Sequence, residues 1–239
     1  MDLTWFVFFL TIRRFLKISP NAMKHVLPIF LIFLLFWQCG CRSYQAQYGN
    51  TSGVQLFAEG KHAEALARFQ SAVETNPEDA DSYYNIAAVH HYLGRVNHNA
   101  DQYAQAGQNY LLCLAKNPNH AAAYRGYAVW FMEQNRKEEA IELLKNWSNL
   151  NPNLPDPKIE LGRLYQELGQ NQEAIDYLSA AIALDPKNAR AHRALGYLRE
   201  LSSDWNQAIL NYKYSLEANP NQPDLVTRIA QLEKQVGLN

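Results

Sequence analysis

Four of the seven histidines lie close together in the sequence and are the first candidates for chemistry. His90, His91, His98 and His120 carry imidazole nitrogens that can ligate a metal ion, and Asp101 could add a carboxylate. Their spacing matches no zinc-binding pattern, and the chain has no phosphate-binding glycine-rich loop and no nucleophile elbow. We therefore interpret them as polar surface side chains and expect no metal, no cofactor and no catalytic residue.

Two cysteines, Cys39 and Cys41, follow directly after an apolar run and form a second group of reactive side chains. The run covers residues 26–37, and a helix of this length spans about 18 Å, against about 30 Å for the hydrocarbon core of a membrane. Such a run with a basic residue before it is typical of a signal peptide. We therefore predict that residues 1–40 are a membrane-targeting leader, with Met23 as an alternative translation start.

The end of this leader resembles a bacterial lipoprotein signal, in which the cysteine after a small residue is acylated. Gly40 and Cys41 fit this pattern, whereas Gln38 stands where the family usually has an aliphatic residue. The resemblance implies a lipid on Cys41, a tether over residues 41–45 and an exported domain anchored in the bacterial cell envelope. Arg42 replaces the aspartate of inner-membrane retention signals, which favours the periplasmic face of the outer membrane. An uncleaved signal anchor is the alternative.

The formal net charge of −1 conceals two different segments. Residues 1–40 hold four basic side chains and one acidic side chain, whereas the rest of the chain holds 18 basic and 22 acidic ones. Positive charge before the apolar run and acidic chain after it favour export of the C-terminal part. This acidic part lacks the basic surface that binds phosphates, so we expect no nucleic-acid partner.

Five Asx-Pro dipeptides punctuate the chain after the leader, and their prolines are 41, 34, 34 and 34 residues apart. Proline disfavours the α conformation in the residue before it, so each dipeptide marks a boundary between helices. A fixed period of 34 residues indicates a helical solenoid. We place its five units at residues 46–79, 80–120, 121–154, 155–188 and 189–222.

Small side chains recur at two fixed positions of these units. The eighth position holds Gly53, Ala87, Ala128, Gly162 and Gly196, and a position in the second half holds Ala65, Ala106, Ala140, Ala174 and Ala208. Large side chains share a third position, with Phe69, Tyr110, Leu144, Leu178 and Tyr212. This pattern predicts two helices per unit that cross closely at the small residues, with turns at Gly60, Asn135 and Gly169.

This arrangement resembles the tetratricopeptide repeat, a helix–turn–helix of 34 residues, and residues 161–186 (LGRLYQELGQNQEAIDYLSAAIALDP) are close to its consensus. The resemblance implies an all-α, right-handed superhelix of five repeats. The amphipathic residues 223–239 are expected to add a capping helix that covers the last repeat. The second unit carries seven extra residues, 95–101, which we expect to form a projecting loop.

In this family the first helices of the repeats line a concave groove that binds partner proteins. The positions carried over to this chain are Asn50, Tyr84, His91, Tyr92, Arg125, Arg163, Arg190, Arg193 and Tyr197. Arginine and tyrosine suit an extended peptide that bears carboxylates, because they combine forked hydrogen bonds with rigid apolar contact. The alternative is a hydrated face on which these arginines are paired with the acids interspersed among them.

The resemblance therefore implies a non-enzymatic scaffold that is exported, tethered to a membrane and bound to protein or peptide partners. Lipoproteins of this architecture include type IV pilus pilotins and a component of β-barrel assembly, so a role in envelope complex assembly is expected. An adaptor that recruits cell-wall hydrolases is one alternative. A cytoplasmic interaction module is another, and it requires that residues 1–40 do not act as a signal.

Overall fold

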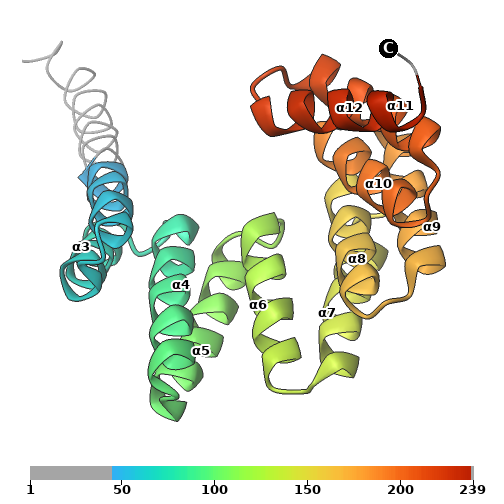
Figure 1. The fold of residues 1–239 in the computed structure, drawn as a ribbon. Helices are drawn as coiled ribbons and strands as arrows, with labels where there is room; N and C mark the ends of the chain where they lie inside the picture. The colour runs from blue at the N-terminus through green and yellow to red at the C-terminus, as the bar shows by residue number, and fades with distance from the viewer. Residues whose placement is uncertain (1–44, 238–239) are drawn as a thin grey trace, which may run out of the picture. The chain divides into compact units, whose positions relative to one another are not determined.

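The computed structural model describes residues 45–237, and within them every regular element is a helix, which confirms the all-α fold class (Figure 1). The predicted leader, Met23 and the lipidation site Cys41 lie outside these residues. The chain divides into two compact units at Ser82, and each is described by itself. No helix between residues 45 and 237 is both long enough and apolar enough to cross a membrane.

The first unit contains a helical stretch at residues 45–58 and helix α3 (His62–Thr75). Gly60 joins them with φ = 79°, a left-handed conformation that glycine adopts without steric cost. The ring of Phe69 lies so close to Gly53 that a Cβ there would overlap it. The small residue therefore permits the close helix crossing that the sequence pattern predicts.

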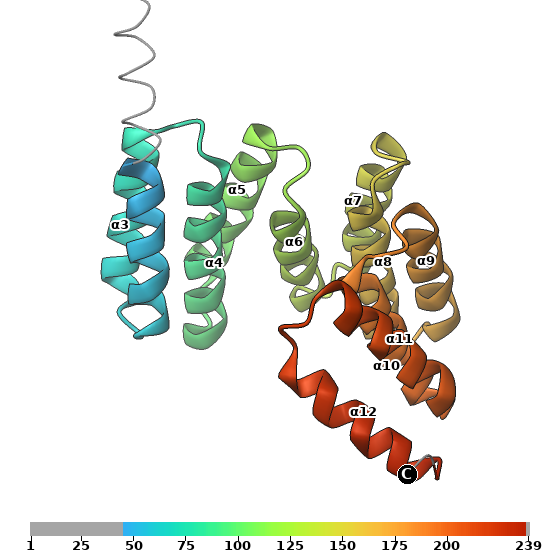
Figure 2. The ribbon, with the colours of Figure 1, turned by 90° about the horizontal axis from the view of Figure 1, so that it is seen from above.

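The remaining helices follow one another in antiparallel succession (Figures 1 and 2). They are α4 (Ala80–Asn97), α5 (Ala100–Lys116), α6 (Ala121–Glu133), α7 (Lys137–Leu150), α8 (Pro155–Glu167), α9 (Asn171–Leu184), α10 (Ala189–Leu201), α11 (Trp205–Ala218) and α12 (Pro223–Gln235). Four of the turns contain a residue with positive φ, namely Asn135 (59°), Gly169 (75°), Ser203 (59°) and His98 (51°). The first two are residues that the sequence predicted for this purpose.

The Asx-Pro dipeptides end the second helix of each pair. The asparagine or aspartate leaves the helix, and in four of the five dipeptides its side-chain oxygen accepts a hydrogen bond from the backbone amide two residues later. The distance is 3.0 Å for Asn117, 3.2 Å for Asp185 and 3.1 Å for Asn219. This local bond replaces helical hydrogen bonding, and the proline that follows cannot continue the helix. The dipeptide therefore stops each helix by chemistry that is contained in two residues.

Glycines on α8 and α10 bring neighbouring helices into direct contact. A Cβ at Gly162 would lie 2.7 Å from Cγ of Leu178, and a Cβ at Gly196 would lie 2.6 Å from Cδ1 of Tyr212. Leu178 and Tyr212 are themselves buried. The large side chain of the second helix therefore occupies the space that the small residue of the first helix leaves free, as in the first unit.

The expectation of a projecting loop at residues 95–101 is wrong. Helix α4 continues to Asn97 and α5 begins at Ala100, so these helices have 18 and 17 residues, whereas α6 and α7 have 13 and 14. The segment contains no glycine or proline, and the side chain of Asn99 caps α5 by accepting from the amide of Gln102 at 3.0 Å. The inserted residues therefore lengthen both helices instead of forming a loop that projects from them.

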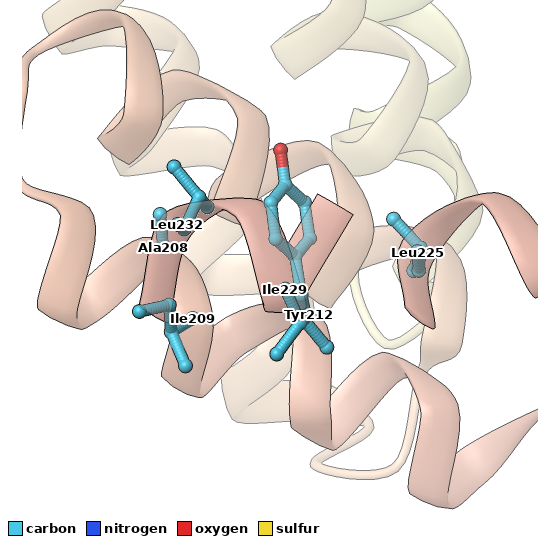
Figure 3. Close-up of a cluster of buried hydrophobic side chains, with 6 residues drawn as sticks. All are labelled: Ala208, Ile209, Tyr212, Leu225, Ile229 and Leu232. Carbon is cyan, nitrogen blue, oxygen red and sulfur yellow. The ribbon is translucent and has the colours of Figure 1, made fainter. Parts of the chain in front are cut away.

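Helix α12 packs on α11 and covers the apolar edge of the last helix pair (Figure 3). Leu225, Ile229 and Leu232 are buried against Ala208 and Tyr212. Their spacing places the three side chains on one face of α12. This is the arrangement expected of a capping helix, because it removes apolar surface of the last pair from water.

Candidate protein-binding groove

A groove of about 550 Å³ opens between α8, α10 and α12, and we call it the α8–α12 groove. Arg163 and Glu167 line it from α8, Arg193 and Tyr197 from α10, and Arg228 from α12. The two residues from each of α8 and α10 are four positions apart, so they lie on one helix face. The groove thus brings together three of the residues that the sequence predicted: Arg163, Arg193 and Tyr197.

Arg125 and Arg190 instead meet at one carboxylate, that of Glu160, and we call these three residues the arginine–glutamate hub. The Arg125 guanidinium donates to both Glu160 oxygens, from Nε at 2.8 Å and from Nη2 at 2.6 Å. Arg190 donates to Glu160 as well, and its Nη1 lies 2.6 Å from Oδ1 of Asp156. The Glu160 side chain is only 1% exposed. These arginines therefore join the first helices of consecutive repeats rather than facing water unpaired.

Two further ion pairs connect α10 to α12 along the groove. Arg193 Nη2 lies 2.6 Å from Oδ2 of Asp224, and Arg228 pairs with Glu200. The pKa of Glu200 lies below its ordinary value, mainly because Arg228 donates hydrogen bonds to this carboxylate. The capping helix therefore contributes charged groups to the groove wall in addition to covering the apolar edge.

Arg163 differs from the other predicted arginines because its Nε is buried and finds no acceptor among the described residues. Burial lowers the pKa of Arg163, and the positive charges of Arg125, Arg190 and Arg193 lower it further. Arg163 is therefore a cation whose hydrogen-bonding capacity is not used within residues 45–237.

Tyr84 and His91 belong to a cluster on α4, α5 and α6 that we call the aromatic joint, together with Tyr103, Tyr110 and Tyr127. His91 contacts the Tyr110 hydroxyl at 3.1 Å through Nδ1 and Glu133 at 2.9 Å through Nε2. Tyr110 stacks on Tyr127 with ring centres 5.8 Å apart. Burial and the nearby Glu133 carboxylate raise the pKa of Tyr103 to about 12. These side chains hold helices together.

Asn50 and Tyr92, the two remaining predicted residues, do not line the α8–α12 groove. Asn50 lies in the first unit, where its amide donates to Asp79 at 2.7 Å and to Ser82 at 3.0 Å. Asp79 also accepts from the Ser82 amide at 3.2 Å, so Asn50 supports the start of α4. Tyr92 is half-buried on α4.

The histidines near the extended helices have separate structural partners, and the interpretation of all four as surface side chains is wrong for His90, which is buried. His90 Nδ1 contacts the side-chain oxygen of Gln102 at 2.5 Å, and His120 caps α6 by accepting from the amide of Ala123 at 3.0 Å. Among residues 45–237, no group of three or more His, Cys, Asp or Glu side chains is arranged to hold a metal ion. The thiol of Cys113 is buried.

Sequence reasoning did not identify Glu160 or the two charged residues of α12 as part of this region. A signal for Glu160 exists, because the other units carry uncharged residues at the equivalent position: Thr51, Asn85, Gly126 and Ala194. Its direct neighbours Ile159 and Leu161 are both apolar and buried. A carboxylate in such a setting must be paired, and the nearby predicted arginines are the available partners.

Comparison with known protein families supports the repeat pattern directly. A family model described as TPR repeat matches residues 53–94 and 162–202, and one described as tetratricopeptide repeat matches residues 99–159. Together these matches cover more than half of the chain. They include the groove-lining residues of α8 and α10 but end before α12.

Curated relatives are longer proteins. BBSome complex member BBS4 of Bos taurus is 28% identical over 73% of this chain and 32% of that protein. The protein CTR9 homolog of Arabidopsis thaliana is 28% identical over 71% of this chain and 16% of that protein. The chain therefore spans less than half the length of these relatives.

Solved structures share the fold over most of the chain. A thermophilic TPR protein of Thermus thermophilus is 28% identical with a TM-score of 0.59, covering 78% of this chain and 98% of that one. PilW, a type IV pilus biogenesis factor, is 19% identical with a TM-score of 0.54, covering 80% of this chain and 86% of that one. With the matching family models, these folds show that the chain is a tetratricopeptide-repeat protein.

Proposed function

We propose that this protein is a non-enzymatic adaptor that binds a segment of a partner protein in the α8–α12 groove. Tetratricopeptide-repeat proteins generally mediate protein–protein interaction, and the groove is the observation that carries the proposal for this chain. Tyr197 lies within it and is 44% exposed, although large aromatic side chains are usually buried. An exposed ring between arginines is the composition of an interaction hot spot.

The lining of the groove favours a peptide over a small metabolite. Its wall alternates arginine, glutamate and tyrosine along α8 and α10, with no enclosed apolar chamber. Such a wall can form hydrogen bonds with an extended backbone along its length, while the tyrosine gives apolar contact. We therefore assign binding rather than catalysis to this surface.

Affinity capture with matched tyrosine variants tests the proposed site. Tyr197→Ala should lose captured partner because it removes the exposed ring from the groove. Tyr214→Ala is the control, since Tyr214 is equally exposed (45%) but lies on α11 outside the groove lining. If both variants capture the same proteins as the wild type, the binding surface lies elsewhere.

We further propose that the protein is exported and tethered to the envelope through Cys41, where it supports assembly of an envelope complex. The chain's own leader motif carries this proposal. Cys41→Ser should abolish labelling by palmitate and release the protein from membranes. Unchanged labelling would refute the lipid anchor, and a soluble wild-type protein would favour the cytoplasmic module.

The captured partner distinguishes the remaining alternatives. A secretin or a barrel-assembly protein would support envelope assembly, whereas a cell-wall hydrolase would support the adaptor that recruits such enzymes. Extraction of the tethered protein from envelopes with mild detergent keeps either complex intact for this experiment.

A further inference from the structure

We propose that Arg163 and Glu167 form a two-point anchor for an acidic residue of an extended partner segment. In this arrangement Arg163 binds the carboxylate of the segment, and Glu167 accepts a backbone N–H next to it. The inference rests on the proposed function, since it names the chemistry of the segment that the α8–α12 groove receives.

The position of the two residues allows one ligand to reach both. Arg163 and Glu167 lie one turn apart on α8 and line the α8–α12 groove. They also line a smaller neighbouring cavity of about 60 Å³, which reaches Arg125 and Glu160. The pair therefore lies where the groove meets the arginine–glutamate hub.

The other charges of the groove have partners within the protein. Arg193 pairs with Asp224, and Arg228 pairs with Glu200. Arg163 and Glu167 form no ion pair with any residue between 45 and 237. The two groups are thus the available cation and the available carboxylate of this groove.

The carboxylate whose charge favours the charged form of Arg163, that of Glu160, is already occupied. Glu160 lies one turn before it on the same helix, but both of its oxygens accept from Arg125 and one also accepts from Arg190. The buried Nε of Arg163 is consequently left without an acceptor among the described residues. Arg163 as a whole is only half-buried and lines the α8–α12 groove, so a ligand in the groove can pair with the rest of its guanidinium.

Charge decides what kind of anion fits. A guanidinium binds a carboxylate or a phosphate with its forked N–H groups. A phosphate would carry nearly two charges past the carboxylates of Glu167, Glu200 and Asp224, whereas a carboxylate brings one. Burial raises the pKa of Glu167 and lowers that of Arg163, and the charges of Arg163 and Glu160 offset these shifts only in part. The groove therefore favours an acidic peptide.

The test uses capped heptapeptides with the sequence Ser-Gly-Ala-Glu-Ala-Gly-Ser and its Gln counterpart, titrated into the full chain. Binding is followed through the Arg163 Nε–H resonance, which Arg163→Gln identifies by its loss. The Glu peptide should shift this resonance saturably and bind about tenfold more tightly than the Gln peptide, as expected for one charged hydrogen-bonded pair. A Gln peptide with a free C-terminus tests the other source, and its preferred binding would assign a chain terminus as the carboxylate.

Variants separate the two points of the anchor. Arg163→Gln should remove the preference for the Glu peptide, and Glu167→Gln should weaken both peptides alike, because it contacts their common backbone. Arg68→Gln, at an exposed arginine on α3, should change neither. Retention of the tenfold preference in Arg163→Gln, or no movement of the resonance, overturns the inference. Loss of partner capture in Tyr197→Ala alongside that result would leave the proposed function standing.

Discussion

The aromatic joint and the arginine–glutamate hub perform the same task with different chemistry. Both connect first helices of consecutive repeats, α4 to α6 in the joint and α6, α8 and α10 in the hub. The joint uses stacked rings, such as Tyr110 on Tyr127, and hydrogen bonds among hydroxyl, imidazole and carboxylate groups, such as Tyr110 to His91 and His91 to Glu133. The hub uses one buried carboxylate shared by two arginines.

The difference explains why the predicted binding residues have such different roles. A ring that packs between helices is buried and is no longer available to a ligand, as with Tyr110 at 2% exposed. An arginine in an ion pair stays partly exposed but has used its donors, as with Arg125. Binding capacity remains only where pairing is incomplete, which is the case for Arg163.

The largest loss of stability is expected for a substitution in the aromatic joint. Tyr110→Ala should lower the free energy of unfolding by about 4 kcal/mol, because it leaves a cavity where a buried ring contacts Tyr84, His91 and Tyr127. Urea unfolding of the full chain, followed by far-UV circular dichroism, measures it. Tyr110→Phe keeps the ring and should cost about 1 kcal/mol for the lost hydroxyl bond. Equal losses for both variants would show that the ring does not hold the joint.

A substitution in the arginine–glutamate hub should lower the free energy of unfolding by less, and this loss should depend on the salt concentration. Glu160→Gln is expected to cost about 3 kcal/mol, because it leaves Arg125 and Arg190 facing each other without the shared charge. The loss should shrink in about 1 M salt, which screens the repulsion between the arginines. Glu138→Gln on α7 is the control, since its side chain is 74% exposed and should contribute little. A salt-independent loss would mean that packing, rather than charge, dominates the hub.

The smallest loss of stability is expected for the ion pair of Glu200 on α10 with Arg228 on α12. Hydrogen bonding from Arg228 depresses the pKa of Glu200 in the folded protein. The pair therefore stabilises the fold at pH values above 4.5, the ordinary pKa of a glutamate. That stability is lost as the pH falls below 4.5 through the depressed pKa. Glu200→Gln should remove about 1 kcal/mol at neutral pH, a small amount because Arg228 is 46% exposed.

The acid limb of the stability curve measures this contribution. The wild type and Glu200→Gln should converge as the pH falls from about 5 to about 3, and Arg228→Gln should behave like Glu200→Gln. Parallel curves for the wild type and Glu200→Gln would contradict the assignment of this acid sensitivity to the α10–α12 pair.

Helix ends and helix crossings could be predicted from the sequence because their causes lie within a few residues. Asn117 ends α5 through its own side chain, and Gly169 supplies the positive φ that the turn between α8 and α9 needs. The extension of α4 could also have been anticipated, because residues 95–97 contain no helix breaker and Asn99 is a good helix cap. The residues in excess of the 34-residue period therefore follow their local helix propensity.

The sequence alone determined a helical repeat with a period of 34, since proline, glycine and Asx act on their immediate neighbours. It also placed arginines on the first helices of the repeats. Only the tertiary structure decided which of them are paired, because Glu160 meets Arg125 and Arg190 across 35 and 30 residues of chain. It likewise brought α12 to the groove. Such contacts depend on how successive repeats pack, so the difference between a structural arginine and the available Arg163 arises only in the fold.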